Sequence, residues 1–222
     1  GGGTSVVANA DTLAEIDLKQ ALEAQKGEAT LVVEDLDPRP DFSAVWADGE
    51  GRLLGFGLEA PARGARPYHF AGIHLLEPSF LRKLPEKESF CLHRDGYLPF
   101  LRGGGDARVW VGARWARDLG TPESYLAVHA ELLKDPARAA RLRGRPFPSE
   151  RNPGVFVDAH CEIAEGVRLL PPVLLEGVRV GPGSEIGPFV VAGPGARLAA
   201  GTRLARSVVC AGADGPDGFA GD

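Results

Sequence analysis

Residues 174–210 read LLEGVRVGPGSEIGPFVVAGPGARLAAGTRLARSVVC, and an aliphatic or similarly small apolar side chain recurs at every sixth position. This series contains Leu174, Val180, Ile186, Ala192, Leu198, Leu204 and Cys210, and an earlier part that is one residue out of phase contains Val157, Ile163 and Leu169. Such a period matches neither an α-helix nor a single β-strand. It is typical of a coil with three short faces, in which the aliphatic residue points inward and the Gly or Ala that often follows forms a corner. The stretch therefore predicts a left-handed parallel β-helix of about three coils. A disordered Gly/Pro-rich tail would not keep its aliphatic residues in phase.

The segments on either side of the repeat have a different composition. Residues 135–154 contain many Pro and Arg and show no apolar periodicity, so we predict a linker with at most one helical turn at its start. The β-helix is assigned to residues 155–212. The final residues 213–222 are rich in Ala, Gly, Asp and Pro, and we predict a disordered tail there.

Residues 1–134 alternate between strand-like and helix-like patterns. Strands are expected at Ser5–Asn9 (buried), Thr30–Glu34, Ala44–Trp46 with Arg52–Leu54 as a hairpin, Tyr68–Leu76 and Val109–Val111, and helices at Leu13–Gln25, near 78–84, near 92–102 and after Thr121. Thr121 is suited to cap the last helix, and Pro122 to its first position. Strands mixed with helices predict an α/β layered domain.

Composition excludes several classes of protein. The net charge of −5 and the lack of a basic cluster argue against nucleic acid as a partner. No apolar run reaches about 18 residues, so no membrane span is expected. The three Cys residues are scattered and form neither a metal-binding pair nor a disulfide framework, which is typical of a cytoplasmic protein. The chain also contains no Met, which fits either a Met-poor protein or a chain that lacks part of the gene product.

Two Asp residues are candidates for a metal site. Asp11 follows the first predicted strand, where ligands of α/β sheets commonly bind, and Asp118 lies just before a predicted helix. Two carboxylates on loops at one edge of a sheet could hold Mg²⁺ through hard oxygen ligands. The alternatives stay open: Asp11 could be a turn residue, and Asp118 could be favoured by the helix dipole.

Three segments, in order and followed by the hexapeptide repeat, resemble one enzyme family. They are residues 7–13 (VANADTL), 70–76 (FAGIHLL) and 115–126 (WARDLGTPESYL). Each segment is similar to a motif of the sugar-1-phosphate nucleotidyltransferases, also called NDP-sugar pyrophosphorylases. The added repeat resembles the mannose-1-phosphate guanylyltransferase and glucose-1-phosphate nucleotidyltransferase branches. The resemblance extends from residue 1 to about residue 212. It implies that residues 1–134 are the C-terminal part of a Rossmann-like catalytic domain.

The resemblance also implies a reaction. A sugar-1-phosphate oxygen attacks the α-phosphate of an NTP and releases pyrophosphate, with no need for a general base because the nucleophile is already an anion. Asp11 and Asp118 would hold the Mg²⁺ cofactor between the two substrates. Glu59 would bind the sugar hydroxyls, and Gly72 would let the backbone approach the sugar. The β-helix would mediate assembly into a homo-oligomer.

Two departures from the family pattern change this expectation. The family begins with a Gly-rich loop that cradles the NTP phosphates, and no segment here matches it, so we expect about the first third of the catalytic domain to be missing and the chain alone to be inactive. Ala60 stands where the family has a Lys, unless Arg63 or Arg66 replaces that cation. The identity of the base and of the sugar is not readable from this sequence.

Two other functions remain as alternatives. Ala60 and the missing loop favour a non-catalytic subunit that senses sugar nucleotides. His160 in the repeat suggests a hexapeptide acyltransferase as the second alternative, because such enzymes use a His between coils as general base. Among the remaining histidines, His69 and His74 are predicted to pack in the core or line a sugar pocket, and His93 and His129 to lie on helix surfaces.

Overall fold

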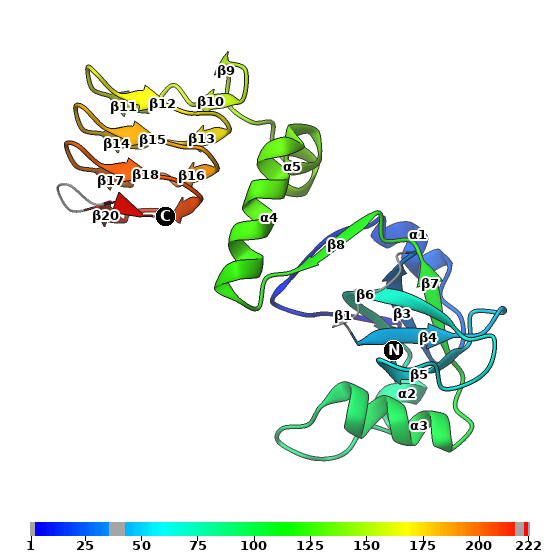
Figure 1. Ribbon diagram of the computed structural model, residues 1–222. Helices are drawn as coiled ribbons and strands as arrows, with labels where there is room; N and C mark the ends of the chain where they lie inside the picture. Colours follow the sequence, from blue (N-terminus) through cyan, green and yellow to red (C-terminus); the bar gives the residue numbers. More distant parts are fainter. Residues whose placement is uncertain (1–2, 36–42, 216–219, 222) are drawn as a thin grey trace. The chain divides into compact units, whose positions relative to one another are not determined.

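The computed structural model describes residues 3–35, 43–215 and 220–221 and divides into two compact units, Gly1–Asp118 and Leu119–Asp222 (Figure 1). The division falls earlier than residue 134, because the helix that precedes this position packs on the second unit. In that unit Leu133 contacts Phe156 and Leu174 in one apolar cluster.

The first unit is built on a mixed β-sheet with the strand order β5-β4-β6-β3-β7 (Figure 1). Its strands are β1 (Ser5–Ala8), β3 (Ala29–Glu34), β4 (Ala44–Ala47), β5 (Leu53–Gly57), β6 (Arg66–Leu76) and β7 (Ala107–Val111). The long β6 organises the sheet. On one side it pairs with β3, and on the other it pairs first with β4 and then with β1. The expected α/β architecture is confirmed.

Both faces of this sheet are covered. On one face, α2 (Pro78–Leu81), the π-helical turn η1 (Leu92–Tyr97) and α3 (Leu98–Arg102) enclose a core that contains Phe80, Tyr97 and Phe100. On the other face, α1 (Leu18–Glu23) packs through Ala21 beside a two-stranded ribbon of β2 (Thr12–Glu15) and β8 (Trp115–Asp118). These two layers position the residues of the candidate site.

Two predictions at the start of the chain are wrong. The helix expected at Leu13–Gln25 begins only at Leu18, after Asp17 caps it by accepting a hydrogen bond from the Gln20 amide at 3.0 Å. The preceding residues form β2, because a partner strand about a hundred residues away overrides the local helical pattern. The strand at Ser5–Ala8 exists, but it is not buried: Val6 and Val7 are 42% and 39% exposed.

The second unit begins with two helices, α4 (Pro122–Lys134) and α5 (Pro136–Arg143). The predicted start of α4 is confirmed: the Thr121 hydroxyl accepts from the Ser124 amide at 3.1 Å, and the Ser124 hydroxyl caps in return. The helix α5 occupies part of the segment predicted as a linker and ends where Gly144 adopts φ 66°. Arg143 also forms an ion pair with Glu176 of the following coils, which ties α5 to them.

The rest of this unit is a β-solenoid of about three turns, as the hexapeptide period predicts (Figure 1). Each turn contributes one strand to each of three parallel sheets, and β9 (Glu150–Asn152) adds an antiparallel edge strand to the first sheet. The strands are β10 (Val155–Val157), β13 (Val173–Leu175), β16 (Val190–Ala192) and β19 (Ser207–Val209); β11 (Glu162–Ile163), β14 (Arg179–Val180), β17 (Arg197–Leu198) and β20 (Asp214–Gly215); and β12 (Arg168–Leu169), β15 (Glu185–Ile186), β18 (Arg203–Leu204) and β21 (Ala220–Gly221).

The aliphatic series is confirmed except at two positions. Leu175 lies in the solenoid core and pairs with Ala192, whereas Leu174 points outward into the cluster with Leu133. At the far end, Val209 takes the inward place beside Ala192, and Cys210 is exposed. The period therefore runs unbroken from Val157 to Leu175, and the phase slip occurs one hexad later than the sequence indicates.

The predicted disordered tail also contains strand structure. β20 pairs with β17, and β21 pairs with β18, so both continue the parallel sheets of the solenoid. The backbone ladder supplies a reason for order that the small side chains of this segment do not reveal.

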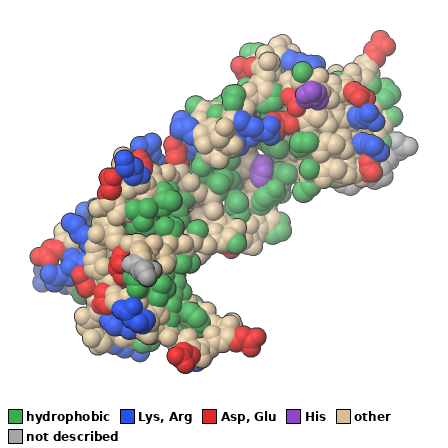
Figure 2. All heavy atoms as spheres, turned by 180° about the vertical axis from the view of Figure 1, so that it is seen from behind, with side chains coloured by type: hydrophobic (Ala, Val, Ile, Leu, Met, Phe, Trp, Pro, Cys, Tyr) green, Lys and Arg blue, Asp and Glu red, His purple; other side chains and the backbone are tan. Residues whose placement is uncertain are grey.

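The outer surface of the solenoid carries both signs of charge. Arg168 pairs with Glu185 at 2.8 Å, and Arg179 pairs with Glu162 at 3.0 Å, each between neighbouring coils. Acidic and basic side chains are interspersed over this part of the molecule (Figure 2). No helix in the described part of the chain is long and apolar enough to cross a membrane.

Candidate functional site

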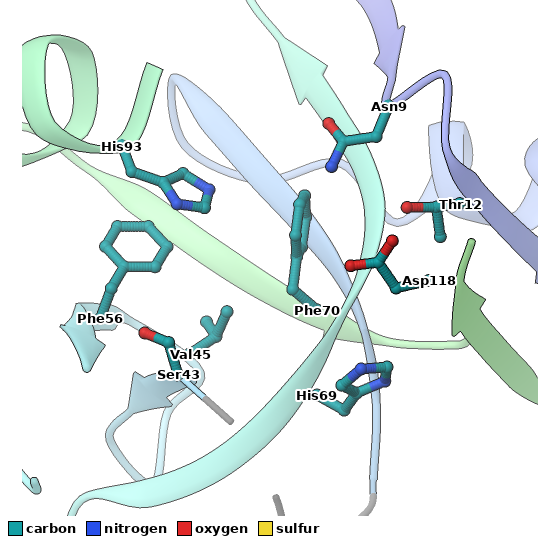
Figure 3. Close-up of a pocket in the computed structure, with 9 residues that line it drawn as sticks. All are labelled: Asn9, Thr12, Ser43, Val45, Phe56, His69, Phe70, His93 and Asp118. Atoms are coloured by element: carbon teal, nitrogen blue, oxygen red, sulfur yellow. The ribbon is translucent and has the colours of Figure 1, made fainter. Parts of the chain in front are cut away.

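A cavity of about 180 Å³ opens in the first unit, at the end of β1 and beside β6. Its lining combines polar side chains with aromatic and aliphatic ones: Asn9, Thr12, Ser43, Val45, Phe56, His69, Phe70, His93 and Asp118. In Figure 3, Thr12 and Asp118 lie on one side of Phe70, and Phe56 and His93 lie on the other. The cavity thus has a polar side and an aromatic side.

The polar side is built where three strands meet. The Asn9 amide donates to the Gly72 carbonyl at 2.8 Å, which extends the pairing of β1 with β6 by one residue. The chain then turns at Asp11 into β2, where Thr12 lies directly opposite Asp118. The structure therefore places the two predicted metal ligands at the same end of the β2–β8 ribbon. Asp118 lines the cavity, whereas Asp11 is an exposed turn residue next to it.

The structure shows why a glycine is needed at position 72, and this local reason is separate from the expected approach of the backbone to a sugar. Its φ is +73°, and a Cβ at this position would lie 2.6 Å from the Cβ of Thr12. The close approach is therefore made by a neighbour within the chain. The glycine allows the β2–β8 ribbon, and with it Asp118, to lie against β6.

We expect Gly72→Ala to lower the free energy of unfolding of the first unit by at least about 1–2 kcal/mol, because the backbone is left-handed and Thr12 must shift. Chemical denaturation followed by tryptophan fluorescence measures this, since Trp46, Trp110 and Trp115 all lie in that unit. Gly104→Ala is the matched control, because Gly104 has φ +78° and no heavy atom within 4 Å of the added Cβ. Equal losses in both variants would contradict a role for the Thr12 contact.

A charged group borders the polar side. His69 of β6 lies with its Nδ1 3.5 Å from the Glu34 carboxylate, and the Arg117 guanidinium lies 3.6 Å from the same carboxylate oxygen. The three side chains are between 12% and 25% exposed, so the charges of Glu34 and Arg117 are only partly screened by water. His69 is the member of this group that lines the cavity. The prediction that it lines a pocket is confirmed.

The aromatic side centres on His93, which the helical spacing assigned to a surface. The structure shows instead that His93 is half-buried and stacks on Phe56, with ring centroids 4.3 Å apart and an interplanar angle of 14°. Phe70 meets the same imidazole edge-on at 5.7 Å. Burial lowers the pKa of His93.

A second histidine lies behind this wall. His74 is 2% exposed, and its Nδ1 lies 3.0 Å from the hydroxyl of Tyr97. Burial, with a smaller contribution from His93, lowers the pKa of His74 to about 3, and burial raises the pKa of Tyr97. Both side chains are therefore neutral at physiological pH. His74 is a core residue, as one of the two sequence alternatives predicted.

The buried His74 makes the stability of the first unit depend on pH. In the unfolded chain its pKa returns to 6.5, so the unfolded state binds a proton that the folded state rejects. The contribution of His74 to the free energy of unfolding is fully present above pH 6.5. It is expected to fall toward pH 3, by up to about 1.4 kcal/mol per pH unit. Denaturation at several pH values measures this slope. His74→Gln should flatten the curve, whereas His129→Gln should not; the same slope in all three proteins would contradict the assignment.

The other predicted site residues lie away from the cavity lining. Glu59 is exposed in the loop after β5, and Ala60 follows it there. Arg66 contacts Asp35 at 3.5 Å and lies over the Tyr68 ring, so its charge is engaged elsewhere. Arg63 is exposed in the same loop as Glu59. His160 is exposed at a corner of the solenoid, where its amide donates to Asp158.

The oxygen donors at the polar side suit a hard cation that takes its remaining ligands from water and substrate. No group of three or more His, Cys, Asp or Glu side chains suited to a metal occurs in the described ranges. Mg²⁺ is commonly held by one or two carboxylates together with water and substrate phosphates. The positions of Asp11 and Asp118 at one end of the β2–β8 ribbon fit that pattern and do not fit a closed structural metal site.

The comparisons with known proteins agree on one class of enzyme. The chain is 30% identical over 201 residues to a mannose-1-phosphate guanylyltransferase of Mycobacterium tuberculosis (strain ATCC 25618 / H37Rv), which covers 82% of this chain and 55% of that protein. It is 28% identical over 195 residues to mannose-1-phosphate guanylyltransferase 1 of Arabidopsis thaliana, covering 78% of this chain and 53% of that protein. The chain spans about half the length of the curated relatives it matches.

Two further findings complete the comparisons. Among solved structures, HddC from Yersinia pseudotuberculosis matches with a TM-score of 0.45 and 21% identity, over 56% of this chain and 53% of that chain. No protein-family model matches the sequence. The sequence is therefore similar to mannose-1-phosphate guanylyltransferases over most of its length.

Proposed function

We propose, from this similarity, that the chain forms the sugar-phosphate and metal-binding part of a nucleotidyltransferase that makes an NDP-sugar from an NTP and a sugar-1-phosphate. Mannose 1-phosphate and GTP are the substrates that the names of the relatives suggest. The observation that carries the proposal is the pairing of Thr12 with Asp118 at the cavity, which brings two separate matched motifs to one site.

The residues at the cavity fit the two ends of a sugar phosphate. Asp118 and Asp11 would hold Mg²⁺, which would supply the charge that offsets the phosphates. The cavity itself would hold the sugar, because aromatic faces and a few polar groups are typical of small-molecule sites. In the reaction, a bond forms between the sugar-1-phosphate oxygen and the α-phosphorus, and the bond to the pyrophosphate leaving group breaks. The chain has to align the sugar phosphate and needs no proton acceptor for the attack.

Ala60 favours a second candidate, a non-catalytic homologue that binds sugar nucleotides. The resemblance places a Lys at this position, and the described side chains around the cavity supply His69 and Arg117 near the polar side instead. A site without that Lys can bind a sugar phosphate yet align it poorly for transfer.

Calorimetry and a pyrophosphate-release assay test the two candidates together. We expect the 222-residue chain with Mg²⁺ to bind mannose 1-phosphate and to release no pyrophosphate from GTP, because no segment resembles the Gly-rich NTP loop. The same assay on a form that includes such a loop separates the candidates: turnover supports the transferase, and binding without turnover supports the sensor. No binding of any sugar phosphate would contradict both, and binding of acetyl-CoA would point to an acyltransferase.

A further inference from the structure

The imidazole of His93 lies on the aromatic side of the cavity, where Ser43 is the other polar side chain of the lining. The ring nitrogens of His93 hydrogen-bond none of the described residues. It enters the cavity from η1, a six-residue π-helical turn, and such turns are rare and frequently lie at functional sites. A half-buried polar side chain that has no hydrogen-bond partner in the described ranges is suited to a partner in a ligand.

We propose that His93 is a specificity-determining residue that hydrogen-bonds a hydroxyl of the sugar ring, with the sugar's phosphate directed toward Asp118. This inference rests on the proposed function and adds to it a residue and an orientation of the substrate. It does not follow from the sequence motifs, which lie on the other side of Phe70.

The packing around His93 fixes the direction of its ring. Phe56 covers one face at 4.3 Å, and Phe70 meets the ring edge-on, so the imidazole cannot rotate freely. Tyr97 lies further back, with its centroid 6.3 Å away. Two aromatic neighbours thus hold the ring in place before any ligand arrives, which lowers the entropic cost of the hydrogen bond.

The charges of the cavity decide which part of the ligand faces His93. Burial keeps this imidazole neutral, so it offers one donor and one acceptor, which matches a hydroxyl better than an anion. The ionisable side chains whose rings lie next to it are His74 and Tyr97, and both are neutral. The charged groups, Asp118 and the Glu34 carboxylate beside His69, lie on the polar side. The neutral sugar ring therefore faces His93, and the phosphate with its metal faces Asp118.

The test compares His93→Phe with the unchanged 222-residue chain by calorimetry in the presence of Mg²⁺. Phenylalanine keeps the stack on Phe56 and removes the hydrogen bond. The probes are mannose 1-phosphate, its mono-deoxy analogues and inorganic phosphate. We expect the variant to bind mannose 1-phosphate about three- to tenfold more weakly and phosphate equally well. One deoxy analogue should bind the unchanged chain with the same loss, and the variant should show no further loss with it.

The controls separate this inference from the proposed function. His129→Phe, on α4, should bind every probe as the unchanged chain does, because the His129 ring already contacts the backbone of Tyr125. Equal affinity of His93→Phe for all probes, or an equal loss for phosphate, would overturn the role of His93 while the proposed function stands. Failure of the unchanged chain to bind mannose 1-phosphate would overturn both. If circular dichroism shows that His93→Phe does not fold, His93→Ala is used with the same expectations.

Discussion

Asp118→Asn is expected to abolish the gain in sugar-phosphate affinity that Mg²⁺ provides, a loss of at least about tenfold. Asn keeps the size of the side chain and one oxygen, but it removes the negative charge that a hard cation requires. Calorimetric titration of mannose 1-phosphate, with Mg²⁺ and with a chelator, measures the difference. The unchanged chain should lose affinity in the chelator, and the variant should bind equally weakly in both buffers.

The matched control for this prediction is Glu165→Gln, which neutralises an exposed acidic side chain in the second unit. It should retain the full response to Mg²⁺. Asp11→Asn is the informative companion, because Asp11 adjoins the cavity without lining it. If Asp118→Asn kept the Mg²⁺ response, the metal assignment would be wrong, whatever the behaviour of Asp11.

The second large effect is expected in the solenoid, where we predict that Gly187→Ala lowers the free energy of unfolding by about 2–5 kcal/mol. Gly187 has φ +112°, and an added Cβ would lie 1.8 Å from the carbonyl oxygen of Leu170 in the preceding coil. The atom that the Cβ would meet belongs to the backbone, directly after the paired strands β12 and β15, so the overlap cannot be relieved by turning a side chain. Differential scanning calorimetry should show the loss as a lower Tm, by about 4–8 °C per kcal/mol for a unit of this size.

Gly201→Ala controls for the backbone conformation alone. Gly201 has φ +69° and no heavy atom within 4 Å of the added Cβ. Gly201→Ala should therefore lower the free energy of unfolding by only about 1–2 kcal/mol, which is the cost of the left-handed backbone conformation. The three tryptophans lie in the first unit, so their fluorescence transition should stay unchanged while far-ultraviolet circular dichroism records the loss. Equal destabilisation by the two alanines would argue against the contact with Leu170.

The solenoid was predictable because its rule is local. A coil needs an inward aliphatic residue at each face, so Val180, Ile186 and Leu198 reveal their positions by spacing alone. The two errors have a tertiary cause. Leu174 is apolar because α4 covers it from outside, and the spacing cannot distinguish an inward leucine from one that faces a helix.

The cavity was only half predictable. The motifs around Asp11 and Asp118 indicate one side, because Asp11 follows a strand that the sequence pattern identifies and Asp118 precedes a helix that it identifies. The strand β8, which carries Asp118, was not predicted. The aromatic side depends on residues 56, 70 and 93, which come from β5, β6 and a π-helical turn. The spacing of apolar residues in the sequence does not indicate that His93 stacks on Phe56. The strand β2 was hidden for the same reason, because Thr12–Glu15 becomes a strand only when β8 lies beside it.

The stacking of the solenoid has a consequence for how this protein can change in evolution. Ile163 lies beside Val180, and Val180 lies beside Leu198, so in the parallel sheets each coil pairs only with the coil before it and the coil after it. A whole coil can therefore be duplicated or deleted without altering the environment of the others, provided that the inward register is kept. The coils differ by one residue in length, since Val157, Leu175 and Ala192 are 18 and 17 residues apart and still pair in register. Length in this half of the chain can therefore change by whole turns, with one residue gained or lost at a corner.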